Sequence, residues 1–464
     1  MKRNIFKNIS PLDHRYSLNE KEFEKYSVYF SEEAVMRYQA KVELAIIEEF
    51  AKEGVCPQET VSEIKGAIEK ISIEEIYKEE EKTKHNTRAL INCIRRKVSE
   101  KTRQYIHLGV TSFDIIDTAA SLRYKEATKN LILPLLLELE KELIRIALRE
   151  KHTLQIGRTH GQHAEPITFG FAISEYVSRL GRSIENIKKT SNELKGKISG
   201  AVGAYNALSL FISDPIDFEK KVLSRLGLKP ATHSTQIVEP EYLNDFIHAI
   251  ITTFGVLANL SDDMRHLQRT EINEIGEYFT ETQVGSSTMP HKHNPINYEN
   301  VKSLWKEFMP RMFTIYMDQI SEHQRDLTNS ASSRFISEII VGLLLSTNRL
   351  IRVLKKLTIE YKSLIKNFNI SKDMIIAEPL YILLAYHGHP DAHEAVRKLT
   401  LKSQETKKKL LDLMLEDKEL SPYYNLFTKT QKNLLKNPEI YVGKSVEKTE
   451  EVTRYWIEKL NITI

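Results

Sequence analysis

The segment 281–295, ETQVGSSTMPHKHNP, gathers residue types that could move protons on a substrate. It holds two adjacent serine hydroxyls, two imidazoles and the ammonium of Lys292. Hydroxyl, imidazole and ammonium groups serve as general acids, bases and stabilisers of negative charge. Helix-like patterns flank this segment on both sides. The residue types alone predict only a polar, cation-bearing loop between helices.

A helix start carries the second group of candidate residues, in HLGVTSFD (107–114). Thr111 or Ser112 can cap the helix, and Asp114 falls in its first turn. A capping role explains these residues by itself and is favoured when the segment is taken alone. The free N–H groups of a helix start also bind carboxylates or phosphates, so both roles stay open.

Two histidines lie three residues apart in GRTHGQHAEP (157–166), namely His160 and His163. A metal pair is disfavoured, because zinc sites need further ligands at a recognisable spacing. A histidine that acts as an acid or base is the better functional interpretation, although either residue alone is more typical of a hydrogen-bonded core position. His85, in KTKHNTRAL (82–90), is a lone histidine of that kind. A last polar segment, HQRDLTNSASSR (323–334), is dense in Arg, Asp, Asn and Ser.

Apolar residues recur at spacings of three and four through most of the chain, which predicts long helices. The longest patterns cover 242–275, 115–151 with a kink at Pro134, 169–194 and 297–321. No alternation of strands and helices is present, so the fold class is predicted as all-α. Such long helices cannot bury their apolar stripes alone, which predicts a homo-oligomer.

Segment lengths suggest three helical domains: 1–110, a central long-helix bundle at 111–364 that includes the loop 282–295, and 365–464. The net charge of +4 on 464 residues gives no reason to expect a nucleic-acid partner. Two cysteines suggest a reducing compartment and no disulfide framework. No signal-peptide pattern or membrane-length apolar run is present, so we expect a cytoplasmic protein.

The order of residues in GSSTMPHKHNP (285–295) resembles the signature loop of the fumarase/aspartase superfamily of lyases. GVTSFDIIDTA (109–119) is similar to a second segment of that superfamily. Within it, GRTHGQHAEPITFG, PLDHRYS, HSTQ and QRDLTNS resemble the branch that acts on adenylosuccinate. The resemblance runs from about residue 10 past AEPLYILLAYHGHPDAHEAV and so covers essentially the whole chain.

This resemblance implies a homotetramer around a core of long helices, with each active site built by three subunits. The implied reaction eliminates fumarate from adenylosuccinate and from SAICAR, its counterpart in purine biosynthesis. The implied chemistry uses no metal and no organic cofactor, and needs a base, an acid and cations for the carboxylates.

The resemblance also assigns catalytic roles. His160 resembles the general acid, and Glu299, twelve residues after the second loop serine, resembles the carboxylate that pairs with this histidine. Ser287 is the preferred base and Ser286 the alternative, with Lys292 and backbone N–H groups to stabilise the oxyanion. A loop that closes would exclude water and bring in the base with the substrate.

The substrate-binding residues follow from the same matches. Thr111 and Ser112 would hold a succinyl carboxylate, and arginines would grip the phosphate through their paired donors. Asn86 stands where many relatives have Asp, which removes a charge beside His85 and weakens the role expected for that histidine. The full predicted set is Arg15, Tyr16, His85, Asn86, His107, Thr111, Ser112, Gln236, Ser286, Met289, Asn294, Arg325, Ser330 and Arg334.

Two rival functions remain at this point. The first is a related lyase or cycloisomerase that acts on another succinyl or carboxymuconate compound, and the RTHGQH segment and the arginine-rich segment oppose it. The second is a helical structural protein that has kept the fold and lost the activity. The intact set of Ser287, Lys292, His160 and Glu299 opposes this second rival.

Overall fold

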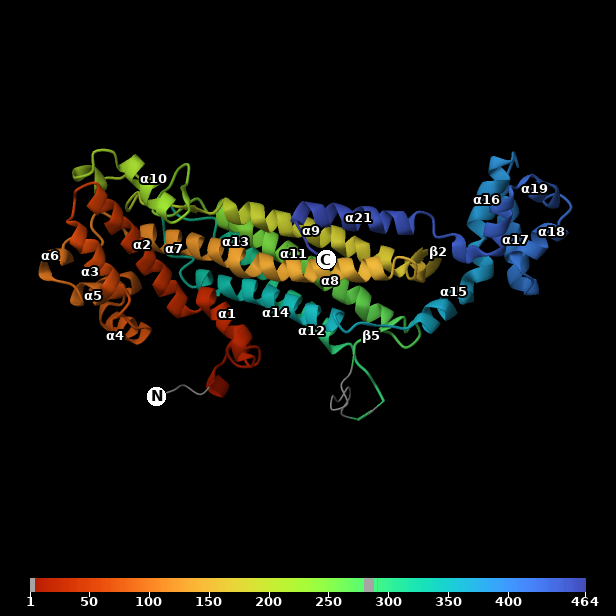
Figure 1. The fold of residues 1–464 in the computed structure, drawn as a ribbon, viewed down its shortest axis with the longest axis horizontal. Coiled ribbons are helices and arrows are strands. Elements are labelled where there is room, and N and C mark those ends of the chain that lie inside the picture. The colour runs from red at the N-terminus through yellow and green to blue at the C-terminus, as the bar shows by residue number, and fades with distance from the viewer. Residues whose placement is uncertain (1–4, 279–287, 290) are drawn as a thin grey trace. The chain divides into compact units, whose positions relative to one another are not determined.

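The computed structural model describes residues 5–278, 288–289 and 291–464 (Figure 1). Helices dominate this part of the chain, and the sheets within it are three pairs of short strands. The predicted all-α class is therefore confirmed. By their contacts the residues form two compact units: unit 1 is Met1–Leu136, Arg182–Leu257 and Ser303–Asn348, and unit 2 is Leu137–Gly181, Ala258–Lys302 and Arg349–Ile464. The three-domain division stays a prediction.

The helices fall into three runs along the chain. The first is α1 (Glu20–Phe30), α2 (Glu32–Lys52), α3 (Gln58–Ile68), α4 (Ile73–Thr83), α5 (Asn86–Arg96), α6 (Glu100–Arg103) and α7 (Ser112–Ala127). The second is α8 (Leu133–Arg149), α9 (Phe169–Asn192), α10 (Pro215–Arg225), α11 (Glu241–Leu267), α12 (Ile296–Phe308), α13 (Arg311–Met317) and α14 (Ile336–Leu354). The third is α15 (Tyr361–Ile375), α16 (Ala377–Tyr386), α17 (Ala392–Thr406), α18 (Leu410–Glu416), α19 (Ser421–Leu426), α20 (Lys429–Lys436) and α21 (Ser445–Leu460).

The short elements are strands and tight helical turns. The strand pairs are β1 (Leu154–Thr159) with β2 (Gln162–Thr168), β3 (Lys195–Gly196) with β4 (Lys229–Pro230), and β5 (Ile275–Gly276) with β6 (Thr358–Ile359). The first and third pairs are antiparallel and the second is parallel. The 3₁₀ turns are Ile5–Lys7, Pro11–Asp13, Leu208–Leu210, Ser332–Phe335 and Pro438–Ile440, and Thr128–Ile132 is a π-helical turn.

The apolar core of unit 1 is centred on α2. Its side chains at Val42, Ile46 and Phe50 recur at a spacing of four residues and are fully buried. The ring of Phe50 stacks on Phe218 of α10, with ring centroids 5.1 Å apart. Figure 1 shows α2 beside α7, and the two helices are in contact. This core fixes the start of α7.

Unit 2 has a separate apolar core among α16–α20, and a small cluster that holds a β-hairpin. The buried core residues include Leu380, Leu384 and Leu410. Ile156 of β1 packs with Phe368 of α15, so the foot of the hairpin β1–β2 rests on α15. Figure 1 draws α16–α19 as a compact group of helices.

Two of the four long helical patterns, those at 242–275 and 297–321, extend beyond the helices of the structure. The pattern at 242–275 ends as a helix at Leu267, because the chain then reverses through Asn273, whose φ is 49°. The pattern at 297–321 is two helices, because Pro310 has no N–H with which to continue α12. The pattern at 115–151 matches one continuous helical run, α7 to α8, from Ser112 to Arg149, in which a π-helical turn lies shortly before Pro134. The fourth, at 169–194, matches α9 within two residues.

Helix α11 is the one described helix that is long and apolar enough to cross a membrane by length and composition. In its most apolar window, 67% of the residues are buried inside the protein. A buried position of this kind is typical of a core helix in a soluble protein.

Candidate active site

The start of α7 brings three of the predicted binding residues close together in unit 1. Thr111 is the N-cap residue and Ser112 begins the helix. The Oγ of Ser112 lies 3.3 Å from Nε2 of His85. Thr111 and Ser112 are half-buried, whereas His85 is exposed. Two hydroxyls and an imidazole thus line a helix start that is accessible from outside the chain.

The hydrogen bonds of His85 define its proton position. Its Nδ1 accepts a bond from the backbone N–H of Arg88, at 3.3 Å, and so caps α5. A neutral imidazole that accepts through Nδ1 carries its proton on Nε2. Nε2–H then points to Ser112 Oγ as a donor. Asn86 accepts from the N–H of Thr87 at 2.7 Å, so its amide oxygen serves the first turn of α5.

His107 contacts a buried carboxylate in unit 1. Its Nδ1 lies 2.6 Å from Oε1 of Glu43, a carboxylate that is 1% exposed. Burial works against the charged imidazole, but the hydrogen bond and charge of Glu43 outweigh it and raise the pKa of His107. The φ of His107 is 62°, in the left-handed region. Glu43 lies 64 residues away in sequence, and the sequence analysis did not find it.

The arginine-rich segment also reaches the start of α7. The guanidinium of Arg325 lies over the ring of Phe113, 4.7 Å from its centroid. The N–H of Gln236 donates to the carbonyl of Gln324 at 3.4 Å. Predicted residues from three distant segments are therefore near each other in unit 1. Ser330 and Arg334 are exposed residues of the same segment, and Arg15 and Tyr16 follow the turn Pro11–Asp13, whose Pro11 carbonyl accepts from both of their N–H groups.

A buried ion pair that no local sequence pattern signals organises this region. Asp114 and Lys197 form a fully buried ion pair, and Ser199 and Gly200 also donate to Asp114. The segment SGAVGAY (199–205) packs here through Ser199 and Gly200. Its signal in the sequence was the pair Gly200 and Gly203, whose φ angles of 83° and 80° favour glycine.

In unit 2, the predicted general acid His160 lies at the tip of the hairpin β1–β2. The two turn residues, His160 and Gly161, have φ angles of 53° and 75°, as a two-residue hairpin turn requires. A non-glycine residue in this region costs about 1 kcal/mol, and such strain gathers at functional sites. His160 is exposed, and among the described residues its side chain has no hydrogen-bond partner.

The base of the hairpin is held by polar bonds. Arg158 donates to Glu274 at 2.5 Å, and this fully buried carboxylate also accepts from Gln155 and from Asn367, each at 2.8 Å. His163 Nδ1 lies 2.8 Å from Ser371 Oγ. Burial and then the charge of Arg158 lower the pKa of His163. His163 is therefore a structural histidine of the hairpin.

Part of the signature loop lies outside the described residues, including both candidate bases, Ser286 and Ser287. Met289 and Lys292 are exposed, Asn294 is half-buried, and the N–H of Lys292 donates to the Met289 carbonyl at 3.0 Å. Glu299 is exposed in the first turn of α12. Between the described side chains of His160 and Glu299 the structure records no hydrogen bond, so the predicted pairing stays a prediction.

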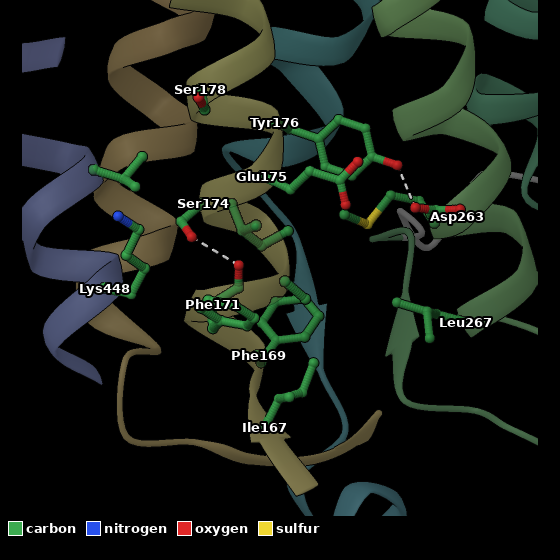
Figure 2. A pocket seen from close by; sticks show the side chains of 14 residues that line it. Ile167, Phe169, Phe171, Ser174, Glu175, Tyr176, Ser178, Asp263, Leu267 and Lys448 are labelled. Atoms are coloured by element: carbon green, nitrogen blue, oxygen red, sulfur yellow. Dashed lines mark hydrogen bonds between the residues drawn. The ribbon is translucent and has the colours of Figure 1, made fainter. Parts of the chain in front are cut away.

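A cavity of the described structure lies elsewhere in unit 2. Its volume is about 440 Å³, and α9, α11 and α21 line it (Figure 2). Figure 2 shows Tyr176 pointing at Asp263, to which its hydroxyl donates a hydrogen bond. Its lining includes none of the predicted site residues. Among the described residues there is also no group of three or more His, Cys, Asp or Glu side chains placed to hold a metal ion.

Comparison with known proteins agrees with this geometry. Residues 15–307 match the family model described as Lyase, and residues 321–437 match the model described as adenylosuccinate lyase C-terminal. In the solved structures, a 3-carboxy-cis,cis-muconate lactonizing enzyme from Pseudomonas putida superposes with a TM-score of 0.83 at 21% identity, over 95% of this chain and 99% of its own. A fumarate lyase from Mesorhizobium sp. BNC1 gives 0.81 at 20% identity, over 94% and 97%. These likenesses concern the fold. The matches define a lyase of the fumarase/aspartase class.

Curated relatives narrow the class. The adenylosuccinate lyase of Methanocaldococcus jannaschii is 33% identical over 454 residues, 96% of this chain and 96% of its own. That of Aquifex aeolicus is 35% identical over 393 residues, 82% of this chain and 87% of its own. The chain belongs to the adenylosuccinate lyase family, whose members are carbon–nitrogen lyases.

Proposed function

We propose that the protein eliminates fumarate from adenylosuccinate, which gives AMP, and from SAICAR, which gives AICAR. Family membership along the full length of the chain carries this proposal, because the relatives align over both the lyase and the C-terminal regions. The cluster of hydroxyl and imidazole groups at the start of α7 supports it, since a dicarboxylate substrate needs donors of this kind.

The reaction breaks the bond between a succinyl carbon and the purine or carboxamide nitrogen. Ser287, or alternatively Ser286, takes a proton from the carbon beside a carboxylate. Lys292 and Asn294 face the negative charge that then spreads into that carboxylate. His160 protonates the leaving nitrogen, and Glu299 keeps the imidazole charged and oriented. The exposed tip position of His160 supports this role, because its ring is free of structural bonds among the described residues.

Binding falls to the other predicted residues. Thr111 and Ser112 hold a succinyl carboxylate, and His85 donates beside them through Nε2. The Arg88 N–H, which donates to Nδ1, fixes the tautomer of His85. His85 can therefore donate through Nε2 even though the neighbouring Asn86 carries no charge. Further contacts to the substrate and its phosphate come from Arg15, Tyr16, His107, Gln236, Met289, Arg325, Ser330 and Arg334.

We further propose a cytoplasmic homotetramer whose active sites each draw on three subunits. The exposed apolar side chains of α13 and the segment after it support an assembly, since Phe313, Met317 and Ile320 are between 65% and 80% exposed. The reaction needs no metal ion and no organic cofactor.

A spectrophotometric assay tests the function. The purified protein is mixed with adenylosuccinate, and the ultraviolet absorbance of the purine and the release of fumarate are followed together. Turnover that yields equal amounts of AMP and fumarate is the expected result. A folded protein that leaves adenylosuccinate unchanged would rule the function out.

A further inference from the structure

The buried carboxylate of Asp114 accepts several hydrogen bonds in unit 1. Neither Asp114 nor its ion-pair partner Lys197 has any exposed side-chain surface. Asp114 accepts from the N–H groups of Thr111 at 2.8 Å, Ser199 at 3.0 Å and Gly200 at 3.1 Å. Lys197 also donates to the Gly200 carbonyl at 3.1 Å. Each of these partners must be in place, because a buried charged or polar group without a partner would cost free energy.

This carboxylate joins the start of α7 to the segment that carries Gln236. Ser199, which donates its N–H to Asp114, has its Oγ 2.7 Å from Ser234 Oγ. At Gly203 an added Cβ would lie 1.9 Å from the Ser234 carbonyl oxygen, so the two segments touch backbone to backbone.

The Gln236 segment is anchored at a second point as well. Beyond Gln236, the N–H of Val238 donates to Asp117 of α7 at 3.0 Å. Burial raises the pKa of Asp117 to about 6, and the Val238 N–H and the charge of Lys197 act against that rise. The Gln236 segment is therefore tied to the first turns of α7 on both sides of Gln236.

The charges of Asp114 and Lys197 affect how well the start of α7 can bind an anion. Among the described residues, the backbone N–H groups of Ser112 and Phe113 have no hydrogen-bond partner, as is usual in the first turn of a helix. A carboxylate bound there would lie close to Asp114, whose negative charge alone would repel it. Lys197 cancels that charge and leaves the positive end of the helix dipole to act on the ligand.

We propose that Asp114 and Lys197 are a positioning pair for the elimination reaction: together they place Thr111, Ser112 and Gln236 for the substrate, and Lys197 neutralises the carboxylate beside the anion site. This inference rests on the proposed function. A merely structural role does not call for these charges, because well-packed apolar residues often replace a buried ion pair without loss of stability. The pair acts through the groups that it holds and does not touch the reacting atoms.

The test compares Asp114→Asn and Lys197→Met with a matched control, Arg225→Met. Arg225 of α10 makes an ion pair with the buried Glu49 of α2 at 2.7 Å in the same unit, and no recorded hydrogen bond joins it to Asp114 or Lys197. For each protein, kcat, KM for adenylosuccinate, the inhibition constant of fumarate and the melting temperature are measured. Wild-type turnover comes first, because its absence would refute the function, whereas the variants test the positioning pair.

Both site variants are expected to raise KM and the fumarate inhibition constant about tenfold, with a smaller change in kcat, because they weaken binding groups rather than proton-transfer groups. The control is expected to lower the melting temperature and leave both constants within about twofold of wild type. If the folded site variants keep wild-type constants, or if the control shifts them equally, the proposal is overturned.

Two more variants keep the test decisive. In the double variant Asp114→Asn with Lys197→Met no charge is left beside the anion site, so its KM is expected to fall below that of Lys197→Met alone. A double variant whose KM is no lower than that of Lys197→Met would overturn the charge-cancelling role.

A further variant serves if Asp114→Asn does not fold. Ser199→Ala removes only the hydroxyl bridge to Ser234 and is expected to raise KM about threefold. An unchanged KM in that variant would overturn the link to Gln236.

Discussion

The start of α7 and the tip of the hairpin β1–β2 are built in opposite ways. At α7, Thr111 and Ser112 stand on a buried and fully bonded network around Asp114. At the hairpin, only the base is fixed, through Arg158 and Glu274, whereas His160 projects from a strained turn without a partner among the described residues. The difference fits the proposed roles, in which Thr111 and Ser112 are binding groups held within one chain and His160 is a proton-transfer group without a structural hydrogen bond among the described residues.

The largest expected effect comes from removing the proton-transfer groups. His160→Ala and Ser287→Ala should each lower kcat at least about a hundredfold, as typical acid–base contributions do. The melting temperature should hardly change for His160→Ala, because the side chain is exposed and without a hydrogen-bond partner within the described chain.

The neighbouring histidine gives the matched control for that variant. His163→Gln breaks the contact with Ser371 and should lower stability, while kcat stays within about threefold of wild type. Near-normal turnover in His160→Ala, or an equal loss of turnover in His163→Gln, would contradict the proposed contrast. In that contrast His160 at the hairpin tip acts on the substrate, whereas His163 only holds the hairpin in place.

The sequence predicted the all-α class, the long helices and the polar segments that gather at α7. It missed the hairpin, because GRTHGQHAEP has no alternating apolar pattern and its turn is signalled by Gly161 alone. It also missed Asp114 as the centre of the site, since the ion pair joins residues 83 positions apart and long-range contacts leave no local pattern. Some helix ends were predicted wrongly. After α11 the backbone reverses near Asn273, although the apolar period in the sequence continues past the end of the helix.

The second prediction concerns the base of the hairpin. Glu274→Gln should lower the free energy of unfolding by about 2 kcal/mol, because it removes a buried anion that Arg158, Gln155 and Asn367 all share. Denaturant unfolding measures this loss. Glu447→Gln, which affects an exposed pair with Lys444, is the control and should leave unfolding unchanged. A Glu274→Gln variant as stable as this control would show that the base is not fixed by these bonds.

The third prediction concerns a buried carboxyl of unit 2, Glu140 in α8. It is 0% exposed, its two oxygens have no hydrogen-bond partner in the described structure, and burial raises its pKa well above the usual value. The stability that its neutral form supports is fully present below the unfolded pKa and is lost as the pH rises through the folded pKa. Glu140→Leu should therefore stabilise the protein by about 1 kcal/mol at pH 8 and by less at pH 5. A gain that does not grow with pH would contradict this account.

The smallest expected effect concerns the imidazole near α7. Because Glu43 raises the pKa of His107, the stabilisation by this pair is fully present below the ordinary histidine pKa and is lost as the pH rises through the raised value. Glu43→Gln should lower the pKa of His107, which proton NMR titration of its ring would show, and should lower stability more at pH 6 than at pH 9. An unchanged pKa of His107 in this variant would show that Glu43 does not control the charge of that imidazole.

The most direct test mixes two inactive chains. His160→Ala and Ser287→Ala chains are unfolded together, reassembled in equal amounts and assayed with adenylosuccinate. If the acid and the base of one site come from different chains, about a quarter of the sites regain both groups, and activity returns toward about a quarter of wild type. Reassembled mixtures with no more activity than either variant alone, beside a wild-type control that recovers fully, would contradict a site shared between chains.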